Sequence, residues 1–131
     1  MKQYLAGWCA VIALALGTPV LAHHSFAATY LEDQSVTIEG EIVQFLLRNP
    51  HSFVHVMVKE QDGSMTRYVV EWGSPSQLTG KVSRDTLKPG DHVIISGTPG
   101  RNASDHRVRL LTFKRPKDGW SWGILEGEKF D

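Results

Sequence analysis

Alternating apolar and polar residues along the middle of the chain predict a series of β-strands. The alternation runs through residues 36–47, where Gly40 lies at a position at which a bulge or a sharp bend is expected. It resumes in residues 51–59 and, after turn residues 61–64, in residues 65–72. Further along the chain, the same pattern predicts strands at residues 92–97 and 106–113.

A short helix is predicted between the third and fourth of these strands. Ser74 is a favourable N-cap, Pro75 suits the first helical position and Gly80 can end the helix. Five strands with one short helix after the third are typical of the OB-fold, a small Greek-key barrel, whereas an immunoglobulin-like sandwich needs about seven strands. We therefore predict a mainly β protein with a five-stranded OB-fold-like barrel at residues 36–113, an N-terminal arm at 23–35 and a C-terminal tail at 114–131.

The turn between the second and third strands decides which of their side chains face the core. A three-residue turn at 61–63 pairs Val54 with Val70, whereas a two-residue turn pairs Val54 with Glu71. We expect the three-residue turn, because a slip by one residue would bury charged side chains. The outer face of the two strands then carries His55, Met57, Arg67 and Glu71.

The first 22 residues have the pattern of a secretory signal peptide. Lys2 precedes an apolar run, and residues 20–22 are small or apolar, which predicts cleavage between Ala22 and His23. A membrane anchor is the weaker alternative, because the apolar run is shorter than the roughly 20 residues that span a bilayer. We therefore expect an exported protein, located in the periplasm of a cell with two membranes.

Composition then excludes several classes of function. The chain of 131 residues has 14 Lys and Arg, 14 Asp and Glu, and one Cys, which lies in the predicted signal peptide. Cleavage would leave no Cys, which excludes a disulfide scaffold, a thiolate zinc site and a Cys nucleophile. The balanced charge argues against a nucleic-acid binder. Because the common phosphate-loop and nucleophile motifs are also missing from the sequence, we expect binding and not catalysis.

Cleavage after Ala22 would make His23 the first residue of the mature protein, with His24 beside it. An N-terminal His offers both its imidazole and its α-amine to one metal ion. A further imidazole from elsewhere would complete a T-shaped site that suits copper. The alternative is a pair of His side chains that simply face solvent.

A second set of candidate ligands lies in the second predicted strand. His51 and His55 would be about 13 Å apart in a regular strand, too far to share one ion, whereas His55 and Met57, about 7 Å apart, could converge on Cu(I). We favour the alternative that His55 and Met57 are partly buried sheet residues. Glu71 could be a metal ligand, an ion-pair partner of Arg67 or an acceptor for a His N–H, and we expect the ion pair.

Trp120 and Trp122 lie in the predicted tail. Their indoles could cover one end of the barrel, or they could form a stacking platform for a ligand. We expect packing, because a small domain needs additional buried apolar area.

Four short motifs carry a family resemblance: HHSFAA at residues 23–28, RNPHS at 48–52, VEWGSP at 70–75 and LKPGD at 87–91. Together they resemble a family of small exported Gram-negative bacterial proteins that is catalogued only as a domain of unknown function. The resemblance covers the mature chain through Phe113 and implies an exported OB-like barrel with no established reaction. If the His-His start and the Asn-Pro-His turn meet in space, it implies His23, His24 and His51 as the natural ligand set.

Our leading hypothesis is therefore a non-enzymatic binding domain that holds copper or another transition metal. The candidate metal ligands are His23, His24, His51, His55, Met57 and Glu71. The alternative is an interaction module that docks a protein, a glycan or a small ligand without metal, on a barrel face or on the Trp-containing tail. A third and less favoured hypothesis is a copper-dependent oxidase of the histidine-brace type.

Overall fold

The computed structural model describes residues 24–123, with the side chains of His24 and Ser25 left undescribed. The predicted signal peptide, its cleavage point and His23 lie outside the described residues. The end of the predicted tail, residues 124–131, lies outside them too.

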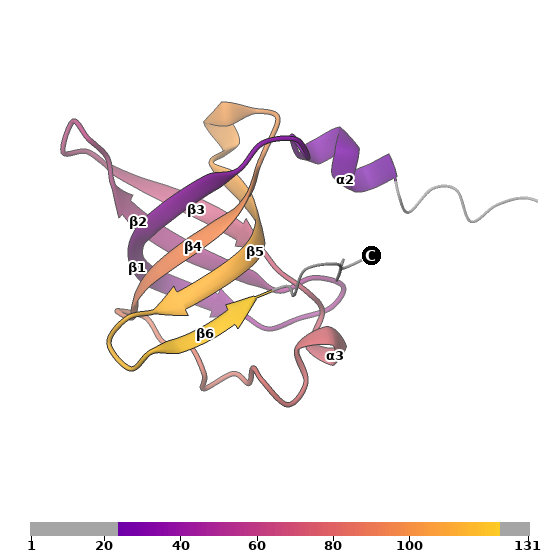
Figure 1. Cartoon of the computed structure of the whole chain (residues 1–131), viewed down its shortest axis with the longest axis vertical. Coiled ribbons are helices and arrows are strands. Elements are labelled where there is room, and N and C mark those ends of the chain that lie inside the picture. The colour runs from indigo at the N-terminus through magenta and orange to yellow at the C-terminus, as the bar shows by residue number, and fades with distance from the viewer. Residues whose placement is uncertain (1–23, 124–131) are drawn as a thin grey trace, which may run out of the picture.

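Five strands close into a barrel (Figure 1). They are β1 (Val36–Leu46), β2 (Phe53–Lys59), β3 (Met65–Glu71), β4 (His92–Pro99) and β5 (Arg107–Arg115). Neighbours in the order β3-β2-β1-β4-β5 pair antiparallel, and a parallel β3–β5 pairing closes the ring. This arrangement confirms the predicted OB-fold-like barrel, with helix α3 (Pro75–Leu78) between β3 and β4.

Strand β1 bends so that it belongs to both sides of the barrel. Its first half pairs with β4 and its second half with β2, and Gly40 pairs with both Val58 and Val93. Of the two features expected at Gly40, a bulge or a sharp bend, the pairing fits the bend, because the register shift falls between Ile42 and Gln44. The extra residue there, Val43, faces outward, so that Ile42 and Phe45 both pack in or against the core.

Gly40 is required for a different reason, the close approach of the β2 backbone. A Cβ at this position would overlap the carbonyl oxygen of Met57. We expect Gly40→Ala to lower the free energy of unfolding by about 1–3 kcal/mol, because the two strands must move apart. Urea unfolding measures the change. Gly123→Ala is the control, since its nearest neighbour would be Thr112 Cγ2 at 3.7 Å, and equal destabilisation by both variants would contradict this explanation.

Three short elements lie outside the predicted pattern. The predicted N-terminal arm contains helix α2 (His24–Thr29), the β4–β5 loop contains a 3₁₀ turn (Ala103–Asp105), and the predicted tail forms strand β6 (Trp120–Gly123) along β5. Figure 1 shows α2 and α3 at opposite ends of the barrel. None of the helices within residues 24–123 is long and apolar enough to cross a membrane.

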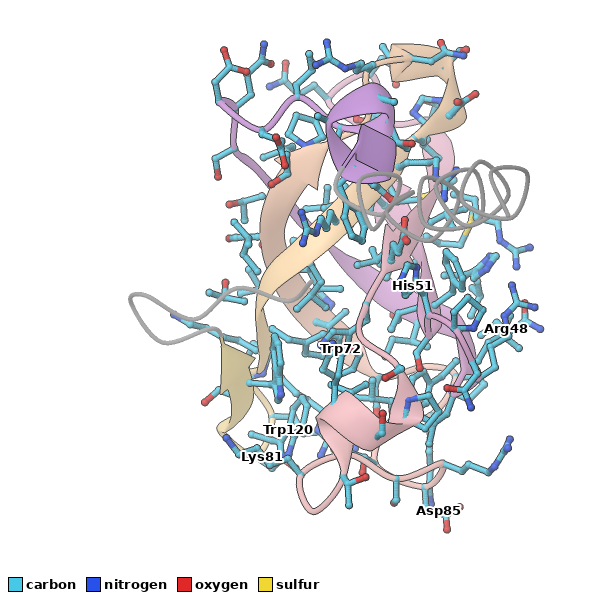
Figure 2. The ribbon with its side chains drawn as sticks, turned by 90° about the vertical axis from the view of Figure 1, so that its right-hand side faces the viewer. Arg48, His51, Trp72, Lys81, Asp85 and Trp120 are labelled. Carbon is cyan, nitrogen blue, oxygen red and sulfur yellow. The ribbon has the colours of Figure 1, made fainter. Side chains whose placement is uncertain are left out.

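The tail indoles pack on the barrel core, as the packing alternative predicts. Trp72 stacks on Phe113 with ring centroids 5.5 Å apart, and Trp122 meets Trp72 edge-on at 5.1 Å. Trp120 meets Phe113 edge-on at 5.4 Å. Trp72 and Trp120 are labelled in Figure 2, on the part of the barrel below His51. Because Trp122 is buried and Trp120 is half-buried, they form part of the core and leave little free surface for stacking.

Candidate functional site

The predicted β2–β3 register is confirmed and brings Glu71 to the end of β3. Val54 pairs with Val70, and Gly63 has the left-handed φ of 85° that the three-residue turn requires. Glu71 is therefore opposite Phe53, on the face that we predicted to be outer. Yet Glu71 is only 8% exposed, so other segments must cover it and supply hydrogen-bond donors.

Three side chains from three different segments donate to the Glu71 carboxylate. The Tyr30 hydroxyl donates to Oε2, and Arg107 Nη2 approaches the same oxygen at 3.4 Å. His51 Nδ1 lies 2.6 Å from Oε1, close enough for its N–H to donate to the carboxylate. Arg107 thus balances the charge of Glu71, and Tyr30 and His51 supply further hydrogen-bond donors to its oxygens. A buried carboxylate requires such partners.

The expected ion pair between Arg67 and Glu71 is wrong. Both residues lie in β3 four positions apart, a separation of about 13 Å in a regular strand. Arg67 donates instead to His55 Nδ1 at 3.0 Å and to Gln44 Oε1 at 3.3 Å. The parallel pairing of β5 with β3 brings a different cation, Arg107, to Glu71. Of the three roles considered for Glu71, the acceptor for a His N–H is the one that the geometry supports.

His51 lies in the loop before β2 and is held on two sides. Backbone bonds between Ser52 and the chain after β3 fix this loop: Ser52 N donates to Gly73 O at 3.0 Å, and Trp72 N donates to Ser52 O at 2.8 Å. The ring of Phe26, from α2, stacks on the His51 imidazole with centroids 5.7 Å apart. Figure 2 shows His51 on the side of the barrel between α2 and α3.

A small hollow opens beside His51. Its lining includes Phe26, His51, Glu71, Trp72, Gly73 and Arg109. The hollow has a volume of about 20 Å³, and a volume of about 10–15 Å³ is enough for one water molecule. It therefore has room for one water or one ion beside its walls.

Arginines hold the segment that covers the hollow. The guanidinium of Arg109 lies 3.8 Å from the centroid of the Phe26 ring, and Arg107 lies over the ring of Tyr30. Tyr30 is fully buried. Burial, together with the hydrogen bond and charge of Glu71, raises the pKa of Tyr30 well above its usual range. The Tyr30 hydroxyl therefore remains a donor to Glu71 at ordinary pH.

The structure separates the predicted metal-ligand candidates. His51 and Glu71 meet, whereas His55 and Met57 do not line the hollow. Desolvation, followed by the charges of Arg67 and Arg48, lowers the pKa of His55. His55 is therefore neutral at pH 7, and a metal at its Nδ1 would have to displace Arg67. The side chains of His23 and His24 lie outside the description, but the α2 backbone begins at His24.

Sequence reasoning missed Phe26, Tyr30 and Arg107. Phe26 belongs to the HHSFAA motif, and its place two residues after the His pair was the signal that could have drawn attention to it. Tyr30 and Arg107 gave no local signal. Among the described side chains, no group of three or more His, Cys, Asp or Glu could hold a metal ion, so a metal site at His51 needs ligands from beyond them.

Comparison with known proteins gives a family without an assigned activity. A family model described as "Family of unknown function (DUF6152)" matches residues 11–109, which includes α2, β1–β4, the loop that carries His51, and Glu71. No curated protein matches the chain.

Proposed function

Because the chain belongs to the family of unknown function DUF6152, whose description names no activity, we propose a function from the geometry of the His51 site. The protein is an exported, non-enzymatic binding domain that holds one transition-metal ion, copper, between His51 and the His23–His24 start of the mature chain. Cleavage after Ala22 supplies the free α-amine of His23. His55, Met57 and Glu71 are not first ligands in this proposal.

The 2.6 Å contact between His51 Nδ1 and Glu71 Oε1 is the observation that carries the proposal. A metal-bound His commonly donates its other ring N–H to a carboxylate, which fixes the tautomer and raises the basicity of the ligating nitrogen. With Nδ1 engaged, Nε2 is the nitrogen that His51 offers to a ligand. The pair His92–Glu39, at 2.8 Å, has the same chemistry but is exposed, and neither residue lines the hollow.

The position of α2 supports the second half of the ligand set. The helix starts at His24, and Phe26 stacks on His51. Along the helix axis the His24 backbone precedes the Phe26 backbone by about 3 Å. In this proposal the His-His start lies against the Asn-Pro-His turn, which is the condition on which the ligand set depends.

The size of the hollow favours an ion over the alternative ligands. A space of about 20 Å³ fits an ion, and the Trp120–Trp122 platform on which a metal-free interaction module could rely is packed against the core.

Copper titration of the mature protein tests the proposal. We expect Cu(II) to bind one-to-one, with an electron spin resonance spectrum that shows nitrogen coupling. An extra Ala before His23 removes the α-amine from the chelate, and we expect it to weaken binding by about tenfold or more and to change the spectrum. A spectrum unchanged by the extra Ala, or a Kd no better than about 1 mM, would contradict the proposal.

A further inference from the structure

We infer that Tyr30 is a positioning residue for this site. Its hydroxyl holds the Glu71 carboxylate in place, and the carboxylate in turn fixes His51 as the tautomer with Nδ1 protonated and Nε2 bare. Because Tyr30 directly follows α2, the orientation of His51 depends on the docking of that helix. The consequence for metal affinity rests on the proposed copper site. The orientation of His51 does not, and it can be measured without metal.

The two oxygens of Glu71 have different partners, and this division sets the direction of the carboxylate. Oε2 receives the Tyr30 hydroxyl and lies 3.4 Å from Arg107 Nη2. Oε1 lies 2.6 Å from His51 Nδ1. Because Oε2 is held by two donors from outside β3, rotation of the carboxylate is restricted and Oε1 stays directed at His51.

Tyr30 is suited to this task because its own position is fixed by the backbone. Its N–H donates to Phe26 O at 2.7 Å at the end of α2, and it forms a β-bridge with Gly100. Nearby, Arg101 Nε donates to Ala27 O at 2.6 Å. These contacts join α2 to the loop between β4 and β5, and they leave the buried Tyr30 hydroxyl with little freedom to leave Glu71.

The same segment also holds the second side of His51. Phe26, four residues before Tyr30, stacks on the imidazole. The His51 ring is thus restrained in two ways. The Glu71 carboxylate, which Tyr30 holds, contacts Nδ1, and the Phe26 ring, on the helix α2 that Tyr30 anchors, covers one face of the imidazole. Displacement of α2 would remove both restraints together.

Nitrogen NMR of the His51 ring tests the positioning role. At about pH 8.5, ordinary imidazoles are neutral. At this pH we expect the His51 ring of the metal-free wild type to favour the Nδ1–H tautomer over the Nε2–H tautomer by about tenfold or more, because the Nδ1–H group donates to the charged carboxylate of Glu71. In Tyr30→Phe the ring remains and the hydroxyl is lost, so the share of the Nε2–H tautomer should rise several-fold. If this variant does not fold, Arg107→Gln, which releases the same Oε2, takes its place.

Tyr68→Phe is the matched control. Tyr68 is half-buried in β3, and burial, followed by the nearby carboxylate of Glu60, raises the pKa of its hydroxyl. We expect its loss to leave the His51 signals unchanged. A dominant Nε2–H tautomer in the wild type, or identical His51 signals in the wild type and Tyr30→Phe, would overturn the inference.

Cu(II) titration of the same proteins separates this inference from the proposed function. If the wild type binds copper, Tyr30→Phe should weaken binding by about three- to tenfold and alter the nitrogen couplings. A wild type that binds no copper overturns the proposed function, while the tautomer measurement still decides the role of Tyr30. If Tyr30→Phe leaves both the copper affinity and the His51 tautomer ratio unchanged, the positioning role of Tyr30 is overturned and the proposed function is not affected.

Discussion

Replacing His51 by Ala should lower the Cu(II) affinity of the mature protein by about a hundredfold or more. Loss of a residue behind a metal ligand costs about 10–100-fold, and His51 is a ligand itself in the proposed site. In the His51→Ala protein, the metal keeps only the ligands of the His23–His24 end. Among the described residues that line the hollow, no other His could replace His51. Isothermal titration calorimetry with a competing chelator measures the change.

His92→Ala is the matched control for this substitution. His92 also pairs with a carboxylate, Glu39, at 2.8 Å, but both side chains are more than half exposed and neither lines the hollow. We expect its copper affinity to equal that of the wild type. A His51→Ala protein that binds as tightly as His92→Ala would place the metal elsewhere on the chain.

Replacing Glu71 by Ala should destabilise the fold by about 3–5 kcal/mol, the cost of removing one partner from a buried charged cluster. The variant leaves the fully buried Tyr30 hydroxyl without its acceptor and Arg107 without its carboxylate. It also frees the segment that follows α2 from β3. Urea unfolding of the metal-free protein measures this loss, and a reduced slope would indicate that α2 has separated from the barrel.

Glu39→Ala provides the comparison for Glu71. Glu39 forms the other His–Glu pair of the described residues, on the surface. Surface pairs contribute little, so we expect a change within about 0.5 kcal/mol. If Glu71→Ala lowered the free energy of unfolding by as little as Glu39→Ala does, the donors around Glu71 would have to find other acceptors. The contacts of Glu71 with Tyr30, His51 and Arg107 could then not be what joins α2 to the barrel.

The barrel could be predicted from the sequence because its signals are local. The period-two alternation marks each strand, Ser74 and Pro75 mark the helix, and the 61–63 turn sets the register of β2 and β3. Gly40 indicated a bulge or a sharp bend, and the sequence does not distinguish these from each other or from a close backbone approach.

The site could be predicted only in part. His51 and Glu71 were each singled out as candidates, but their contact depends on segments far apart in the chain. Tyr30 is 41 residues from Glu71, and Arg107 is 36 residues from it. Nothing local in residues 23–35 indicated that this arm would fold as α2 over the barrel, because a helix of six residues is formed by tertiary packing more than by its own propensity.

A crystal structure of the processed protein with Cu(II), with anomalous scattering recorded at the copper edge, tests the proposed site most directly. We expect one anomalous peak at about 2 Å from His51 Nε2, the usual metal–imidazole bond length, with the α-amine and imidazole of His23 as further ligands. A peak at His55 or His92, or copper bound at the His23–His24 end with His51 Nε2 uncoordinated, would contradict it.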